Sequence, residues 1–232
     1  MYLIIIILVV AITLFLVWAS SDIGSNIYLK ATCKAETQER VVALTFDDGP
    51  AEPMTLKVLD ILRKYDAKAA FFLIGRQVDK YPDIVRQIVV EGHIVANHTM
   101  SHSGLFPLSS AKSVKAELLS CSCSITKAVG LRPKLFRPPF GVTNPIIGRM
   151  VKQLGFNTIG WSIRSLDTVT RYSREDICRK VERSLHPGAI ILLHDRCLQS
   201  DELLESIILA VVNSGYRIVA LDELLNIDVY EN

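Results

Sequence analysis

Residues 41–50 read Val-Val-Ala-Leu-Thr-Phe-Asp-Asp-Gly-Pro, a short apolar run that ends on two adjacent carboxylates. The run Val41–Phe46 is rich in β-branched and aromatic side chains and has the length of a buried strand. Asp47 and Asp48 follow at its carboxyl end, directly before the turn-forming pair Gly49-Pro50. Because folds made of parallel strands keep their functional groups at this end of the sheet, the two acids are candidate site residues.

The rest of the chain repeats this pattern of a strand followed by a helix. Further strands are predicted at residues 69–74, 93–97, 135–137, 158–161, 189–193 and 216–220. Helical spacing of apolar residues predicts helices at 54–65, 82–91, 109–129, 145–154, 174–185, 201–214 and 221–225. About seven strands that alternate with helices predict an α/β fold with parallel strands. The pattern leaves two architectures open, a closed or nearly closed barrel and an open doubly wound sheet.

The overall composition fits a folded domain with a sizeable core. The chain has 232 residues, of which 50% are hydrophobic, and its 26 Lys and Arg against 24 Asp and Glu give a net charge of +2. This composition excludes a disordered or fibrous chain. Without a cluster of Lys and Arg, nothing indicates a nucleic-acid partner. The five cysteines cannot all pair within one chain and do not have the spacing of a zinc site.

The apolar residues are concentrated at the N-terminus, where Leu3–Ala19 carries no charge. The length of this run lies between that of a signal-peptide core and a full membrane span of about 20 residues. The small residues Ala19-Ser20-Ser21 would suit a signal peptidase, but no Lys or Arg precedes the run. We therefore expect residues 1–21 to be a membrane anchor, with a cleaved signal segment as the alternative. Residues 22–38 are then a linker, and residues 39–232 form the main domain.

Further ionisable residues follow the other predicted strands. His98 follows the third strand, Arg137 ends the fourth, Asp167 comes after the fifth, and His194 follows the sixth. His98 and His102 are four residues apart, and in a helical turn this spacing directs two imidazoles to one point. Two imidazoles and one carboxylate are the ligands of a catalytic divalent-metal site with open positions. One of Asp47 and Asp48 could bind that metal while the other faces the water.

Five segments that contain these residues resemble, in order, the motifs of the polysaccharide deacetylase family. This family is also called the NodB-homology group or carbohydrate esterase family 4, and the resemblance covers residues 39–225. The segments are Thr45-Phe-Asp-Asp-Gly-Pro50, His98-Thr-Met-Ser-His102, Arg137-Pro-Pro-Phe-Gly141, Trp161-Ser-Ile-Arg-Ser-Leu-Asp167 and Leu192-Leu-His-Asp195.

The resemblance implies a distorted (β/α) barrel of about seven strands that hydrolyses N-acetyl groups of amino sugars with a divalent metal. It assigns metal binding to Asp48, His98 and His102, and general-base and general-acid roles to Asp47 and His194. Arg137 would orient Asp47, Asp167 would hold His194, and the backbone N–H of Phe140 would contribute to an oxyanion hole. The donor set favours zinc, with cobalt or nickel as alternatives.

Three positions bear on the substrate. Leu192 and His194 point to the same side of an extended strand, so Leu192 either contacts the acetyl methyl group or packs inside the barrel. In the fourth motif, Arg164 stands where many members have Asp, and Thr168 stands where they have Trp. Arg164 could contact a carboxylate-bearing substrate such as a muramic acid residue, or be solvated or ion-paired. Loss of the Trp removes an aromatic wall for a sugar ring.

The expected function is therefore removal of N-acetyl groups from N-acetylglucosamine-type residues of a cell-envelope polysaccharide, such as peptidoglycan or a chitin-like oligomer. One alternative is an O-acetyl ester hydrolase of xylan-like glycans, and another is a non-catalytic glycan-binding relative. The polymer substrate places the domain outside the cytoplasm, tethered by the N-terminal helix with residues 20–39 as a flexible stalk. Cleavage of the helix would instead give a secreted enzyme.

Overall fold

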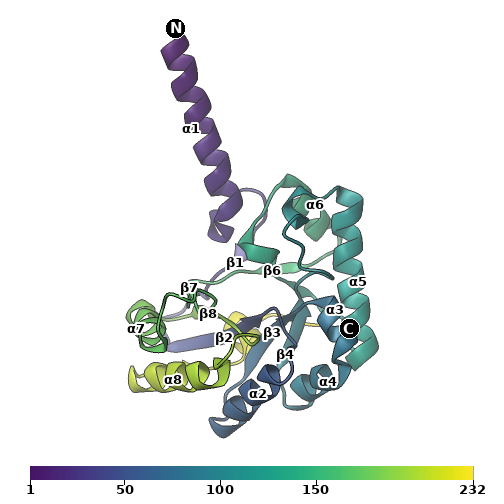
Figure 1. Ribbon diagram of the computed structural model, residues 1–232, viewed down its shortest axis with the longest axis vertical. Helices are drawn as coiled ribbons and strands as arrows, with labels where there is room; N and C mark the ends of the chain where they lie inside the picture. The colour runs from purple at the N-terminus through teal and green to yellow at the C-terminus, as the bar shows by residue number, and fades with distance from the viewer. Residues whose placement is uncertain (232) are drawn as a thin grey trace.

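The computed structural model describes residues 1–231 and shows a curled sheet covered by helices (Figure 1). The strand order is β1-β6-β5-β4-β3-β2-β8-β7, and β9 also pairs with β2. The paired strands run parallel throughout. The strands are β1 (Ala31–Thr32), β2 (Val41–Asp47), β3 (Ala69–Leu73), β4 (Ile94–Asn97), β5 (Leu135–Phe136), β6 (Asn157–Ile159), β7 (Ile163–Arg164), β8 (Ala189–His194) and β9 (Arg217–Ile218).

The two ends of this strand order approach each other, which distinguishes a barrel from an open sheet. Lys34, just beyond β1, forms an isolated antiparallel bridge with Ala189 of β8. The Ser162 N–H, just beyond β6, donates to the carbonyl of Ile190 over 3.1 Å. The chain therefore forms the distorted (β/α) barrel that the resemblance implied, and the doubly wound alternative is wrong.

Helices cover the outside of the barrel, as the alternating pattern predicted. They are α2 (Met54–Lys64), α3 (Gly75–Lys80), α4 (Pro82–Val90), α5 (Ala111–Val129), α6 (Pro145–Gln153), α7 (Arg174–Ser184), α8 (Ser200–Asn213) and α9 (Leu221–Leu225). Short 3₁₀ turns occur at η1 (Ile23–Ser25), η2 (Phe106–Leu108) and η3 (Pro139–Gly141). The predicted strands and helices are confirmed with small shifts at their ends, whereas β1, β7 and α3 were not predicted.

Strand β2 shows how the sheet separates two cores. Val42, Leu44 and Phe46 pack outward into the large core beneath the helices. Ala43 points the other way, into a smaller core inside the barrel. Successive strand residues face opposite sides, so Thr45 and Asp47 share the inward direction of Ala43. The barrel interior therefore carries polar side chains at its carboxyl end.

The N-terminal helix α1 (Tyr2–Ser21) projects from the barrel beside β1 (Figure 1). It is the one helix among the described residues that is long and apolar enough to cross a membrane. The segment after it, expected to be a flexible stalk, is instead packed against the domain. Its strand β1 pairs with β6, and the Ala35 N–H donates to the carbonyl of Gly188 over 2.8 Å.

Candidate active site

Asp47 and Asp48 lie at the carboxyl end of β2, and their carboxylates turn to different partners. Asp47 is the last residue of the strand and is paired in register with His194 of β8. Asp48 adopts a left-handed conformation with φ of 76°, so the backbone turns sharply between the two residues. Both side chains are buried. The predicted division between adjacent carboxylates is therefore present in the geometry.

Arg137 crosses the barrel interior to reach Asp47. Its side chain is completely buried, and its Nη1 donates to Asp47 Oδ1 over 2.7 Å. Further donors reach the Thr45 hydroxyl and the carbonyls of Ile159 and Gly160, at 2.8 to 3.0 Å. A buried guanidinium is stable only when its charge and its N–H groups are matched, as they are here. This network fixes the position of the Asp47 carboxylate.

His98 and His102 meet Asp48 at the same rim. Their Nε2 atoms lie 3.5 Å and 3.3 Å from Asp48 Oδ1, and the two rings are 4.9 Å apart. The sequence pattern predicted that a helical turn would bring the two histidines together. This prediction was wrong, because residues 98–102 do not form a helical turn. Thr99 and His102 have positive φ values of 67° and 48°, and the His102 N–H donates to Thr99 Oγ1. A bend with left-handed residues brings the imidazoles together.

Neighbouring elements hold this bend in place. The Thr99 N–H donates to Asn97 Oδ1 at the end of β4, over 2.9 Å. Glu117 of α5 accepts hydrogen bonds from both the N–H and the hydroxyl of Ser101. The two histidines are thus fixed between the sheet and a long helix, and we infer that they need little rearrangement to bind an ion.

The three side chains fit a divalent metal ion. Asp48, His98 and His102 each offer a ligand atom, and these atoms lie within 4.8 Å of one another. Asp48 Oδ1 is buried and has no hydrogen-bond partner, which marks an acceptor left for a cation. His98 Nδ1 lies 2.7 Å from the Arg137 carbonyl, so we assign its proton to Nδ1 and its free lone pair to Nε2. Burial and the neighbouring His98 lower the pKa of His102, which favours its neutral, ligating form.

His194 and Asp167 form a second pair at the same rim. His194 Nδ1 lies 2.8 Å from Asp167 Oδ1, and the His194 N–H donates to Asp167 Oδ2 over 2.6 Å. Ser165 also donates its hydroxyl proton to Asp167 Oδ1. Burial acts to lower the pKa of His194, but the hydrogen bond and charge of Asp167 outweigh it and raise that pKa above its ordinary value.

A pocket joins the metal cluster to the His194 pair. All of the predicted site residues except Arg137 and Asp167 line it, and Leu192 reaches the cavity together with His194. Phe140 has a φ of 60° and lies edge-on to His102 with ring centroids 4.7 Å apart. Arg137 and Asp167 lie behind the lining and contact Asp47 and His194. The lining consists of Asp47, Asp48, His98, His102, Phe140, Gly141, Trp161, Arg164, Thr168, Leu192, His194 and Arg196.

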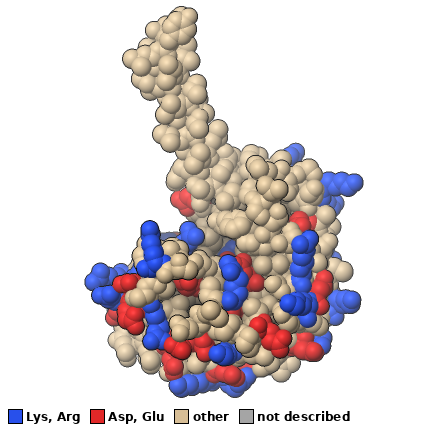
Figure 2. All heavy atoms as spheres, in the orientation of Figure 1, with Lys and Arg blue, Asp and Glu red and all other residues tan. Residues whose placement is uncertain are grey.

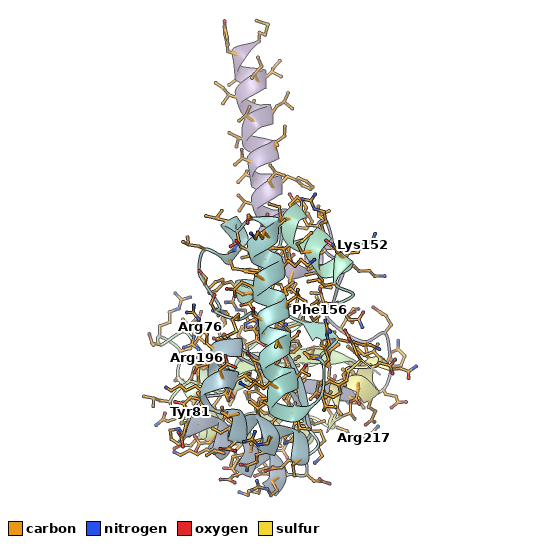
Figure 3. The ribbon with its side chains drawn as sticks, turned by 90° about the vertical axis from the view of Figure 1, so that its right-hand side faces the viewer. Arg76, Tyr81, Lys152, Phe156, Arg196 and Arg217 are labelled. Carbon is orange, nitrogen blue, oxygen red and sulfur yellow. The ribbon has the colours of Figure 1, made fainter. Side chains whose placement is uncertain are left out.

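Sequence reasoning missed Arg196, which lies on the flank of the domain in Figure 3. Its Nε donates to Asp48 Oδ2 over 2.7 Å, while about half of the side chain stays exposed. Arg196 therefore occupies the carboxylate oxygen of Asp48 that does not face the histidines. Its place directly after His194-Asp195, at the end of a strand, was the signal that could have drawn attention to it.

The sequence of this chain is similar to those of known glycan deacetylases. The sequence profile of a family described as polysaccharide deacetylase matches residues 34–159. A peptidoglycan-N-acetylglucosamine deacetylase of Bacillus cereus is 36% identical over 84% of this chain and 92% of its own length. A peptidoglycan-N-acetylmuramic acid deacetylase of Bacillus subtilis is 32% identical, over 82% of this chain and 73% of its own.

Solved structures agree in fold. A crystal structure of a peptidoglycan N-acetylglucosamine deacetylase superposes with a TM-score of 0.81 at 29% identity, covering 86% of this chain and 94% of that one. A CE4 family pseudoenzyme from Bacillus anthracis superposes with a TM-score of 0.77 at 26% identity, covering 84% of this chain and 68% of that one. The same fold thus occurs in a protein named as a deacetylase and in one described as a pseudoenzyme.

Proposed function

The chain belongs to the polysaccharide deacetylase family, and from this premise we propose that it removes N-acetyl groups from amino sugars of a cell-envelope polysaccharide of the peptidoglycan type. One observation carries the proposal. A carboxylate held by Arg137 and an imidazole held by Asp167 flank the cluster of Asp48, His98 and His102 in one pocket. Amide hydrolysis needs an activated water, a stabilised oxyanion and a proton for the leaving nitrogen, and this arrangement offers a group for each.

Asp48, His98 and His102 would hold the metal ion. Two imidazoles and one carboxylate favour zinc, with cobalt or nickel as alternatives, over magnesium or calcium. When bound, the ion supplies a Lewis acid that polarises the amide carbonyl and lowers the pKa of water. The orphaned Oδ1 of Asp48 supports this assignment, because a buried acceptor without a partner is otherwise costly.

Asp47 acts as the general base. Its Oδ1 is held by Arg137, whereas its Oδ2 lies 3.8 Å from His98 Nε2 and therefore faces the metal cluster. The proton that leaves the attacking water is accepted at this second oxygen. Arg137 holds the carboxylate in place, so that its second oxygen is directed at the cluster before it accepts the proton.

His194 acts as the general acid. Asp167 fixes the proton on Nδ1, so Nε2 is the atom that donates a proton to the departing amino-sugar nitrogen. Leu192 contacts the acetyl methyl group, because it lines the pocket on the strand that carries His194. The backbone N–H of Phe140 contributes to the oxyanion hole from the opposite wall.

The helix α1 anchors the enzyme in the cell membrane, and the barrel acts on the outer side, where its polymer is found. In this division residues 1–21 are the anchor, residues 22–38 connect it to the domain, and residues 39–232 form the catalytic domain. The packing of Ala19 within the folded chain supports retention of the helix, because a peptidase site must be accessible.

Acetate release tests the function. The full chain in detergent should release acetate from N-acetylated chitooligosaccharides or peptidoglycan fragments, lose this activity with a chelator and regain it with zinc or cobalt. Acetylated xylan tests the ester-hydrolase alternative, and faster turnover on xylan would replace the proposed substrate. Full activity in a sample shown to be free of metal would refute the mechanism, and no activity on either glycan would favour a binding protein.

A further inference from the structure

The end of the membrane helix is hydrogen-bonded to a loop of the active site. The Thr143 N–H donates to the carbonyl of Ser20 over 2.9 Å, and the Ser25 hydroxyl donates to the carbonyl of Ala19 over 3.0 Å. Ala19 is fully buried, whereas residues 2–18 of α1 are exposed. The last turn of α1 is therefore part of the folded domain.

The same loop forms a wall of the pocket. Phe140 and Gly141 line the pocket, and Thr143 follows Phe140 by three positions. A chain extends at most about 3.6 Å per residue, so about 11 Å of backbone at most separates Phe140 from Thr143. Phe140 in the pocket wall therefore lies within about 11 Å of Thr143, which is hydrogen-bonded to the end of α1.

The segment that connects α1 to the barrel is packed against the domain along its length. Ile23 is buried and packs against Gly160, and Gly148 of α6 lies so close to the Tyr28 carbonyl that a Cβ atom would be 2.0 Å from its oxygen. If the 17 residues of the linker, 22–38, were free, they could extend to about 60 Å. As folded, the segment cannot extend in this way, so the pocket stays near the membrane surface.

Exposed apolar side chains also lie on a turn that is connected to the helix end through Asn144 and Thr143. Leu105 and Leu108 are 69% and 84% exposed and flank the buried Phe106 in η2. Asn144 Nδ2 donates to the Pro107 carbonyl over 2.6 Å, which ties η2 to the loop that contacts α1. We call Ile27, Leu105 and Leu108 the apolar collar; Ile27 follows η1 and is 48% exposed.

Charge is distributed in the complementary way. Figure 2 shows few Lys, Arg, Asp or Glu atoms on the part of this face that borders α1, and many on the part far from it. Trp18 stands in the last turn of α1, where an aromatic side chain suits the interface between lipid and water. A surface with few charges that continues from a membrane helix favours contact with lipid over contact with water.

We propose that the apolar collar rests on the membrane surface and holds the pocket there, so that the enzyme acts on amino-sugar glycans carried by a membrane lipid. This inference rests on the proposed function and on α1 as a membrane span. In Figure 3, Arg196, which lines the pocket, lies at the flank of the domain and not at the end far from α1. We infer that a glycan held at the membrane surface can reach this flank.

Quenching of tryptophan by brominated lipids tests the contact. The full chain is reconstituted in phosphatidylglycerol and phosphatidylethanolamine vesicles, with L105W or L108W compared with the parent chain. Val90 of α4, which is 85% exposed, provides the control V90W. We expect additional quenching for L105W and L108W and none for V90W. Absence of additional quenching at both leucines, or equal quenching at Val90, would overturn the proposal.

Turnover distinguishes failure of this inference from failure of the proposed function. The double variant L105E/L108E should lose about tenfold in turnover of an N-acetylated disaccharide coupled to a lipid in the same vesicles, because it cannot settle on the surface. Its turnover of a soluble chitooligosaccharide should be unchanged, and V90E should match the parent on both substrates. An equal loss of turnover on both substrates, or no loss on either, would refute the proposal that the apolar collar rests on the membrane. A parent chain inactive on the soluble glycan would refute the proposed function, while the quenching result would still stand.

Discussion

Asp47 and Asp48 are neighbours in the chain, yet Arg137 holds the carboxylate of Asp47, whereas that of Asp48 lies with His98 and His102 in the candidate metal cluster. Asp47→Asn should therefore retain metal and lose about 10²–10⁴-fold in kcat, the usual cost of a missing general base. Asp48→Asn should lose metal, because the amide supplies no anionic ligand. Metal content by atomic spectroscopy and acetate release measure the two effects, with Asp201→Asn on α8 as a control. Equal loss of metal in both variants would show that the base is assigned wrongly.

The pair of His194 and Asp167 predicts a dependence on pH. A general acid must be protonated, and Asp167 raises the pKa of His194, so activity should fall as the pH rises through that raised pKa. Asp167→Asn removes the charge that raises the pKa, and the alkaline limb of the profile should then move to lower pH. A pH profile of kcat/KM checks this shift. An unchanged alkaline limb would assign that limb to another group.

Arg196 offers a test of how Asp48 is positioned. Its Nε holds Asp48 Oδ2, which leaves Oδ1 directed at the histidines. Loss of such an outer hydrogen bond commonly weakens metal binding by about 10- to 100-fold. We expect Arg196→Ala to bind zinc about tenfold more weakly, measured by competition with a chromophoric chelator, and Arg196→Lys to bind with intermediate affinity. Tighter binding in Arg196→Ala would show that repulsion between guanidinium and metal prevails over positioning.

At the residue scale, the sequence indicated which side chains gather but not how. Strand ends of a parallel sheet meet at one rim, which was enough to bring Asp48, His98 and His194 into one expected site. The bend at residues 98–102 could not be foreseen, because its left-handed residues are Thr99 and His102 and neither is glycine. Such conformations are fixed by tertiary contacts, here with Asn97 and Glu117. The roles of these residues in catalysis remain predictions.

At the element scale, most strands and helices were predictable, whereas β1, β7 and α3 were not. The strand β2 was recognisable as a continuous apolar run, and the helix α5 by the helical spacing of its apolar residues. β1 and β7 have two residues each, too few to show any period, and their pairing with β6 and β8 is set by the fold. Closure of the barrel depends on these short strands and on the bridge from Lys34 to Ala189, so the sequence pattern left it open.

Gly148 tests the packing between α6 and the segment after α1. A Cβ atom at this position would lie 2.0 Å from the Tyr28 carbonyl oxygen, so Gly148→Ala must displace backbone. We expect a loss of about 1–3 kcal/mol in the free energy of unfolding, typical of overpacking. Gly104→Ala is the matched control, because a Cβ atom there meets nothing within 4 Å. Chemical denaturation of both variants measures the difference, and equal stability would mean that Tyr28 moves freely.

At the scale of the whole molecule, the sequence identified an apolar helix and a domain but not the rigid joint between them. Residues 22–38 have no strong hydrophobic period, which favoured the stalk. Their order comes from individual contacts instead, such as Ile23 against Gly160 and Ala31 paired with Thr158. Contacts of this kind depend on the finished barrel and therefore leave no local signal in the sequence.

This joint leads to the last prediction, which concerns the fate of α1. The helix has 20 residues and so spans about 30 Å, the thickness of the hydrocarbon core. The bonds around Ala19 and Ser20 lie in its last turn, and the packing of Ala19 shields them from a peptidase that needs an extended, accessible segment. N-terminal sequencing of the protein in the membrane fraction should therefore find Met1. A reporter that functions only outside the cytoplasm should be active when it is fused after Asn232, and a reporter that functions only in the cytoplasm should be inactive there. A Ser25→Ala variant lacks the hydroxyl that donates to the Ala19 carbonyl. It serves as a comparison, because partial cleavage of this variant would not contradict the prediction. A mature chain that begins near Asp22 would replace the anchor with a signal peptide, and a reporter active only in the cytoplasm would reverse the orientation.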